Sequence, residues 1–172
     1  MATTAVRIVG PRDGKVGSLG GVGVRFLIDG SESGGGFSLV EHPLEPRALA
    51  APMHRHSRED EYSFILEGQV GADLGGEIIV GEVGDLIFKP RGQWHTFWNA
   101  GDTPARLLEI ISPAGFEKFF DTLADLAAKG ELAPPIMATL AAEYGTELDF
   151  DSIPGLLAKH RLVFPGGPPP EQ

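Results

Sequence analysis

Short apolar runs recur along the first 111 residues, and no helical periodicity interrupts them. Glycine-rich clusters separate the runs, among them Ser31–Gly36, Leu74–Gly76 and Gly81–Gly84. Short strands at spacings of about 8–12 residues, joined by such turns, are typical of antiparallel sandwiches and barrels. The pattern therefore predicts an all-β domain over residues 1–111. We expect its strands at Val22–Ile28, Phe37–Val40, Tyr62–Leu66, Glu77–Val80, Asp85–Phe88, His95–Trp98 and Arg106–Ile111.

Helical periodicity begins after Ser112-Pro113. Apolar side chains recur three or four positions apart within Phe116–Gly130, and the final glycine is well placed to end a helix. A second helix is expected over Pro135–Glu143, where proline suits the first position, and a third around Ile153–His160. These segments predict a helical extension over residues 112–164. It is expected to pack on the barrel, either as a lid over its mouth or within a dimer interface.

The two ends of the chain show no targeting or structural signal. The N-terminal stretch MATTAVRIVGPRDG lacks the basic and apolar regions of a signal peptide. No apolar run approaches the roughly 18–20 residues that span a bilayer, so we expect a cytoplasmic protein. The tail PGGPPPEQ cannot continue a helix or donate to a sheet, and residues 165–172 are therefore predicted to be disordered.

Charge and cysteine content narrow the range of partners. The formal net charge of −10 repels phosphate backbones and anionic lipids, which argues against nucleic acid and membrane surfaces as partners. The chain contains no cysteine, which excludes disulfides, thiolate zinc sites and thiol nucleophiles. A small-molecule ligand or substrate remains the expected partner.

A histidine pair is the first candidate for metal binding. His54 and His56 are separated by one residue, so they point to the same face if the segment is extended. Two imidazoles on one face can bind one cation at about 2.0–2.1 Å. Glu61 follows a polar turn and begins the run Tyr62–Leu66, so it can return on a neighbouring strand and offer a carboxylate oxygen.

A third histidine follows a turn later in the chain. The turn Pro90-Arg91-Gly92 separates two strand-like segments, and His95 begins the second of them. The aromatic residues Trp94, Phe97 and Trp98 surround it in sequence, which predicts burial. A buried imidazole needs a polar partner or a metal ion.

These two stretches closely resemble the paired motifs of the cupin family. The first family motif reads Gly, five residues, His-x-His, three or four residues, Glu, six residues, Gly. This chain matches it with His54, His56, Glu61 and Gly68, and departs from it only at Ala48 in the leading glycine position. The second motif reads Gly, five residues, Pro-x-Gly, two residues, His, three residues, Asn. This chain matches it throughout with Gly84, Pro90, Gly92, His95 and Asn99.

The resemblance covers roughly residues 36–111 and matches nine of ten fixed positions. It implies a double-stranded β-helix, the jelly-roll barrel of cupins, with six to eight strands. It further implies one divalent transition metal, Fe, Mn, Ni, Cu, Co or Zn, held by His54, His56, Glu61 and His95. Two alternatives stay open: a metal-free polar network of the same residues, and Glu59 or Asp60 as the carboxylate ligand.

The expected site chemistry follows from the implied ligands. Three neutral imidazoles and one carboxylate leave a divalent ion with a net charge of about +1 and open positions, which suits a bidentate anion. Glu61 is the candidate catalytic base if it detaches during turnover. By strand alternation Ser63 and Ile65 share the face of Glu61, and Phe97 shares that of His95, so these three are candidate pocket residues.

The resemblance to quercetin dioxygenase-like single cupins implies an enzyme, a metal-dependent dioxygenase for a small apolar or aromatic substrate with an anionic oxygen pair. The alternatives are a non-oxidative isomerase or lyase, and a non-catalytic binding or sensing protein. A homodimer is expected, because cupins commonly pair through an outer sheet face and the barrel has strand edges to cover.

Three arginines and two histidines that are not fixed positions of either motif are less specific candidates. Arg25, Arg47 and Arg91 are candidates for an anion clamp or are ordinary surface charges. His42 and His160 are expected to be exposed or structural.

Overall fold

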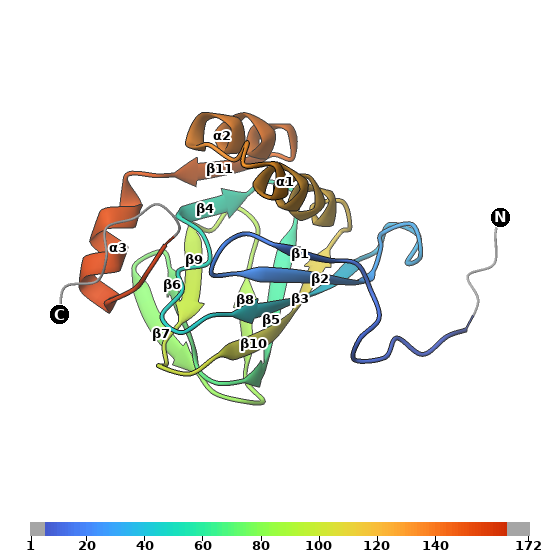
Figure 1. Cartoon of the computed structure of the whole chain (residues 1–172), viewed down its shortest axis with the longest axis horizontal. Helices are drawn as coiled ribbons and strands as arrows, with labels where there is room; N and C mark the ends of the chain where they lie inside the picture. Colours follow the sequence, from blue (N-terminus) through green and yellow to red (C-terminus); the bar gives the residue numbers. More distant parts are fainter. Residues whose placement is uncertain (1–5, 165–172) are drawn as a thin grey trace.

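Two antiparallel sheets form the body of the protein in the computed structural model, which describes residues 6–164 (Figure 1). The six-stranded sheet has the order β1-β2-β3-β10-β5-β8, and the five-stranded sheet the order β11-β4-β9-β6-β7. The strands are β1 (Val16–Ser18), β2 (Gly23–Ile28), β3 (Ser38–Leu44), β4 (Met53–His56), β5 (Asp60–Glu67), β6 (Val70–Leu74), β7 (Glu77–Gly81), β8 (Leu86–Lys89), β9 (His95–Asn99), β10 (Ala105–Ser112) and β11 (Thr146–Asp149). This architecture is a double-stranded β-helix, which confirms the predicted fold class. The predicted tail, residues 165–172, lies outside the described residues.

Alternation along the strands places apolar side chains between the sheets. In β10, Ala105, Leu107 and Ile111 are buried, whereas Arg106, Leu108 and Ile110 are half-buried. Similar inward positions on six further strands build one core cluster, which includes Ile65 and Phe97. Each such side chain stabilises the fold by roughly 1.5–3 kcal/mol through burial. This core fills the end of the barrel away from the helices and fixes the strands that carry the polar residues described below.

Every strand predicted from an apolar run is present, but four others were not predicted from such runs: β1, β4, β6 and β11. The segment of β4 was considered only as one that would bring His54 and His56 to one face if it is extended. In β6, Gly71 and Asp73 interrupt the run of apolar residues that would have predicted the strand. A Cβ on Gly71 would lie 2.3 Å from the Trp98 indole, so the close approach of this ring requires glycine. The strands β1 and β11 are only three and four residues long, which is too short for a pattern of apolar and polar residues to identify them.

The three predicted helices are present as α1 (Glu117–Lys129), α2 (Pro134–Glu143) and α3 (Ser152–His160). Glu117 accepts hydrogen bonds from the backbone N–H groups of Gly30 and Gly115, which fixes the start of α1 against the β2–β3 connection. Gly130 ends α1 in the left-handed conformation with φ 71°. None of the helices among residues 6–164 has the length and apolar content needed to cross a membrane.

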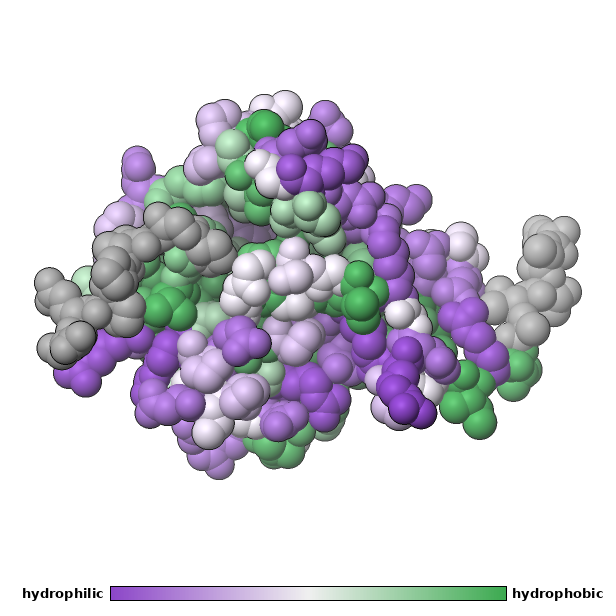
Figure 2. Space-filling model, in the orientation of Figure 1, coloured by the Kyte–Doolittle hydropathy of each residue, from purple (hydrophilic) through white to green (hydrophobic). Residues whose placement is uncertain are grey.

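The helices α1 and α2 lie together over one end of the barrel, beside β11 and β4 (Figure 1). Phe119 and Leu123 of α1, with Phe116 at its N-cap, pack against the inward residues Val40 and Ile111 of the six-stranded sheet. In Figure 2, hydrophobic side chains are visible in the recess between these helices and the barrel. The extension therefore covers the mouth of the barrel in this structure.

Candidate metal centre

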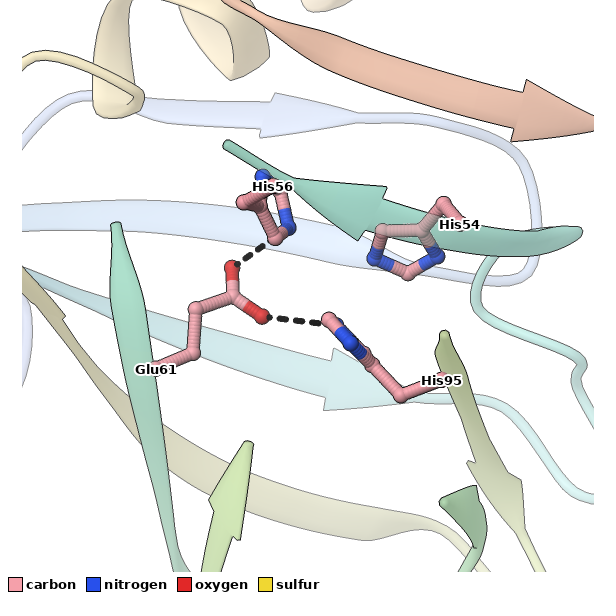
Figure 3. Close-up of side chains that lie close together, drawn as sticks. All are labelled: His54, His56, Glu61 and His95. Carbon is pink, nitrogen blue, oxygen red and sulfur yellow. Dashed lines mark hydrogen bonds and ion pairs between the residues drawn. The ribbon is translucent and has the colours of Figure 1, made fainter. Parts of the chain in front are cut away.

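Four polar side chains converge inside the barrel beneath α1. The strand β4 provides His54 and His56, β5 provides Glu61 and β9 provides His95 (Figure 3). One potential ligand atom of each residue lies within 4.8 Å of those of the other three. The residues are 6%, 1%, 2% and 1% exposed, in chain order. The structure therefore brings together the four residues that the sequence motifs single out.

Strand register explains this convergence. In β4 the two histidines alternate with the half-buried Met53 and Arg55, so both rings point inward. His54 lies directly opposite His95 in the β4–β9 pair, and the two ring centres are 4.3 Å apart. The polar turn after β4 lets the chain cross to the other sheet, where Glu61 faces the same space.

Each imidazole is anchored through Nδ1. In both His54 and His95, Nδ1 lies 2.9 Å from the carbonyl oxygen two residues earlier. A carbonyl oxygen only accepts, so these rings carry their proton on Nδ1 and a lone pair on Nε2. The third ring, His56, places Nδ1 3.0 Å from the hydroxyl of Thr146. This pattern is typical of metal-ligating histidines, whose second nitrogen is oriented by a neighbouring group.

The space between the rings fits a cation. His56 Nε2 is buried and has no hydrogen-bond partner among residues 6–164, and Glu61 Oε1 lies 3.5 Å from it. Buried polar atoms almost always have a partner, so an orphaned lone pair at this position needs a ligand. Three ring nitrogens and one carboxylate are donors that divalent first-row metals accept. The residues therefore fit the metal that the sequence motifs imply.

The charge states also suit metal binding. Burial lowers the pKa of His54 well below its ordinary value, and the His95 and His56 rings lower it further. Burial likewise lowers the pKa of His95. Burial alone would raise the pKa of Glu61, but Lys89 and His56 hold it well below its usual range. A neutral imidazole and an ionised carboxylate are the forms that bind a metal ion.

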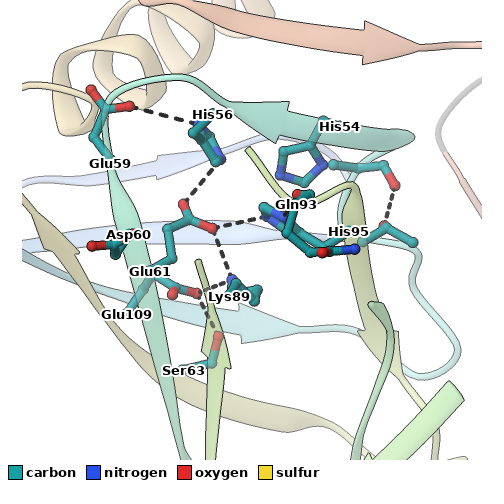
Figure 4. Close-up of polar contacts among 12 residues, drawn as sticks. His54, His56, Glu59, Asp60, Glu61, Ser63, Lys89, Gln93, His95 and Glu109 are labelled. Carbon is teal, nitrogen blue, oxygen red and sulfur yellow. Dashed lines mark hydrogen bonds and ion pairs between the residues drawn. The ribbon is translucent and has the colours of Figure 1, made fainter. Parts of the chain in front are cut away.

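A second polar layer lies directly below the four residues (Figure 4). Lys89 Nζ lies 3.0 Å from Glu61 Oε2 and 3.0 Å from Glu109 Oε2. The Ser63 hydroxyl donates a hydrogen bond of 2.8 Å to the same Glu109 oxygen. Burial lowers the pKa of Lys89, but Glu109 and Glu61 more than reverse this and raise it. Burial raises the pKa of Glu109 to about 7, although Lys89 opposes this.

Lys89 and Glu109 were missed by the sequence reasoning, although a signal for them exists. Lys89 lies two positions after the inward Ile87, and Glu109 lies between the inward Leu107 and Ile111. By strand alternation both charges fall on the inner face. A charged residue at a predicted core position is therefore the pattern that identifies this layer.

A cavity of about 60 Å³ adjoins the cluster under α1. Its aromatic wall consists of Phe97 from the barrel and Phe116, Phe119 and Phe120 from α1. Its polar part includes His54, Glu61, Glu109 and His42. The cluster therefore opens on a mostly apolar space with few polar groups, as small-molecule sites commonly do.

The predicted pocket residues divide between two places. Phe97 lines the cavity. Ser63 and Ile65 face inward with Glu61 but lie deeper, where Ser63 bonds Glu109 and Ile65 belongs to the apolar core, so neither lines the cavity. Their distance along β5 from the barrel mouth accounts for the difference.

The alternative carboxylate ligands lie outside the cluster. Asp60 pairs with Arg91 at 2.7 Å. Glu59 is 4% exposed, and its carboxylate lies 3.9 Å from His56 Nδ1, on the side of the ring that faces away from Glu61. Glu61 is thus the carboxylate that faces the three Nε2 atoms.

The arginines and histidines that are not fixed motif positions contact other parts of the molecule. The three arginines considered as anion clamps each pair with an acidic side chain, in the ion pairs Arg25–Glu41, Arg47–Asp102 and Arg91–Asp60. His160 stacks on the Trp98 ring at 4.3 Å. His42 is not exposed: it is buried and lines the cavity, because the inner face of β3 carries it under α1.

Comparison with known proteins identifies the domain. The cupin domain model matches residues 41–111. A Streptomyces glaucescens protein named tetracenomycin polyketide synthase protein TcmJ is 30% identical over 93 residues. This stretch covers 54% of the present chain and 62% of that protein, which is less than two thirds of its length.

Solved structures share the fold. The polyketide cyclase RemF from Streptomyces resistomycificus is 28% identical, with a TM-score of 0.55 over 63% of this chain and 80% of that one. KdgF from a Halomonas species is 15% identical, with a TM-score of 0.58 over 66% of this chain and 99% of that one, and shows likeness of fold alone. With its double-stranded β-helix, its matched cupin domain and a His/Glu cluster able to bind a metal ion, this chain belongs to the cupin superfamily.

Proposed function

We propose that this protein is a metal-dependent enzyme that moves protons on a small, flat substrate carrying an oxygen pair, such as a β-dicarbonyl compound of polyketide type. The observation that carries the proposal is a carboxyl group outside the ligand set. Glu109 lines the cavity, is buried, and its Oε1 has no hydrogen-bond partner among residues 6–164. An acid-base group beside a metal-type cluster is what proton transfer next to a carbonyl group requires.

The residues divide the work as follows. The three histidines and Glu61 would hold a divalent metal, which would supply Lewis acidity and make the carbon between two carbonyl groups more acidic. Glu109 Oε1 takes the proton from this carbon and returns it to another atom of the substrate. Lys89 and Ser63 hold Glu109 Oε2 and so orient the carboxyl group. The aromatic wall excludes water from the reacting atoms.

Glu61 was the catalytic base suggested by the sequence, and the proposal gives it another role. Its Oε2 lies 3.0 Å from Lys89 Nζ and 3.2 Å from His95 Nε2. A carboxylate oxygen that accepts from Lys89 and faces the lone pair of His95 Nε2 is placed to share a cation with that ring, whereas Glu109 Oε1 is free to exchange a proton. Two relatives support this chemistry, RemF as a polyketide cyclase and TcmJ as a polyketide synthase protein.

A dioxygenase is the second candidate, and the ligand set favours it. Three imidazoles and one carboxylate also accept redox-active ions such as Fe and Mn, with open positions for substrate. The two functions differ in one requirement, because proton transfer proceeds without oxygen and dioxygenation consumes it.

One assay separates the candidates. Ethyl acetoacetate in deuterated buffer is followed by NMR for exchange at its central carbon, in air and under argon, with an oxygen electrode in parallel. We expect metal-loaded protein to accelerate exchange equally in both gases, and Glu109→Gln to lose the acceleration while retaining metal. Oxygen uptake in place of exchange would favour the dioxygenase. The absence of both exchange and oxygen uptake would overturn both candidates.

The metal requirement is tested on the same samples. His54→Ala and His95→Ala each remove one imidazole, so both are expected to lower metal content sharply while the barrel stays folded. Full metal occupancy in both variants, measured by elemental analysis, would contradict the proposed centre.

A further inference from the structure

A fourth imidazole, His42, faces the cavity from outside the cluster. It lies on the inner face of β3, is 2% exposed, and lines the cavity together with Glu61, Glu109 and Phe97. Neither family motif includes it, and the proposed proton transfer does not use it. A buried polar ring beside a mostly apolar cavity needs hydrogen-bond partners for its two nitrogens.

The hydrogen bonding of His42 determines its tautomer. Its Nδ1 lies 2.9 Å from the backbone carbonyl oxygen of Gly23 on β2. Because this oxygen only accepts, the ring proton sits on Nδ1, and Nε2 carries a lone pair. Within residues 6–164 the ring's hydrogen bond is the one made by Nδ1, and the ring lines the cavity, so Nε2 is an acceptor available to a ligand there.

Packing and charge keep this acceptor in place and neutral. Phe120 contacts the ring edge-on at 5.0 Å between centres, and Phe97 lies on another side at 6.3 Å. Burial lowers the pKa of His42 to about 4, with Lys89 adding to the effect and Glu61 and Glu41 opposing it. The ring therefore stays uncharged at neutral pH, where its Nε2 accepts hydrogen bonds and is a poor base.

We propose that His42 Nε2 accepts a hydrogen bond from a hydroxyl or enol O–H group of the bound substrate, in addition to the oxygen pair held at the metal. This inference rests on the proposed function and narrows its substrate class to hydroxylated compounds. A substrate without this hydroxyl leaves a buried acceptor unpaired, and sites of this kind discriminate strongly against such analogues. His42 is accordingly a residue that determines specificity and orientation.

The tautomer is tested first, on zinc-loaded protein labelled with ¹⁵N. The ring signals of His42 are assigned by their loss in His42→Asn. We expect a protonated Nδ1 and an unprotonated Nε2 at neutral pH. A ring protonated on Nε2, or on both nitrogens, cannot accept a hydrogen bond there and would overturn the inference without any ligand.

Hydroxyl recognition is tested with two probes, catechol and pyrogallol, which share an oxygen pair and differ by one hydroxyl. By calorimetry we expect wild-type protein to bind pyrogallol about tenfold more tightly, the usual contribution of one buried hydrogen bond. Asn places an N–H group near the position of Nδ1 but offers nothing at Nε2, so His42→Asn should abolish the preference. Gln places an amide oxygen near the position of Nε2, so His42→Gln should restore part of it. Zinc content confirms that both variants are folded.

The outcomes separate this inference from the proposed function. Catechol that binds zinc-loaded protein no better than metal-free protein would contradict the oxygen-pair binding on which the proposed function depends. Catechol that binds through zinc, with no preference of the wild type for pyrogallol, would overturn the role of His42 alone. A preference that persists in His42→Asn would overturn it equally.

Discussion

Lys89 is a buried ammonium group in the centre of an apolar barrel, 1% exposed, with its Nζ 4.5 Å from the centre of the Phe97 ring. Such a charge is tolerated only where opposite charges replace its hydration. Glu61 and Glu109 do so, each at 3.0 Å. One of these partners is a candidate metal ligand, so the charge balance of the lower layer and the geometry of the cluster depend on each other.

Removal of this ammonium group should be costly. We expect Lys89→Met to lower the free energy of unfolding by about 3–5 kcal/mol, because it leaves Glu61 and Glu109 buried without their cation. Combining it with Glu109→Gln removes the second uncompensated charge, so the double variant should lose less than the sum of the single losses. Urea denaturation of the four proteins in the cycle measures this coupling. Strictly additive losses would show that the two side chains act independently.

His42 gives the stability of the protein a specific dependence on pH. Its pKa is lowered from 6.5 to about 4 by burial, so the folded state binds fewer protons than the unfolded state between these values. Stability from the neutral ring is fully present above pH 6.5 and is lost as the pH falls towards 4. The shift corresponds to about 3 kcal/mol. We expect urea denaturation of His42→Asn and wild-type protein to show a stability gap at pH 7 that narrows by this amount at pH 4. A gap independent of pH would contradict the buried neutral ring.

At the scale of elements, β11 connects the helical extension to the cluster. It pairs with β4 over the register Thr146↔His56 to Asp149↔Met53. Within residues 6–164, the Thr146 hydroxyl is the one side-chain hydrogen-bond partner that β11 gives to a ring of the cluster, at 3.0 Å from His56 Nδ1. The extension thus orients a candidate metal ligand as well as covering the cavity.

Loss of the Thr146 hydroxyl should weaken metal binding. Valine has the same shape but no oxygen, so Thr146→Val leaves His56 Nδ1 without its hydrogen-bond partner. Groups that orient a metal ligand commonly contribute about 10- to 100-fold in affinity, and we expect zinc affinity to fall by this factor. Competition with a chelating dye measures it. Thr139→Val is the matched control, since that hydroxyl bonds only Pro135 on the exposed side of α2. An equal effect of both substitutions would refute the role of β11.

The sequence predicted the elements whose signal is local. Alternation marked the longer strands, three- and four-residue spacing marked the helices, and motif spacing marked the four residues of the cluster. The pairing of β11 with β4 joins residues 90 positions apart. The four residues of β11 contain no sequence pattern that predicts this pairing. The sequence also did not predict the cavity wall formed by Phe116, Phe119 and Phe120, because an apolar helix face does not show which part of the molecule it packs against.

At the scale of the whole molecule, the outer face of the six-stranded sheet carries an apolar surface. Phe64, Leu86 and Phe88 are 38%, 55% and 48% exposed, and Tyr62 stacks on Phe88 at 4.9 Å. These residues lie on β5 and β8, and β8 is an edge of its sheet. An aromatic surface that continues to an unpaired edge strand is a common site of association, and it is the surface on which the expected homodimer would form.

We predict that the protein is a dimer in solution and that this surface forms its interface. A carboxylate buried between two apolar faces loses its hydration, so Phe88→Glu should shift the protein towards monomer. Ile136→Glu is the matched control, because Ile136 is 43% exposed on α2 at another part of the molecule. Sedimentation velocity over a range of concentrations measures the association of all three proteins. A monomeric wild type would refute the dimer, and dissociation by Ile136→Glu alone would move the interface to the helices over the barrel mouth.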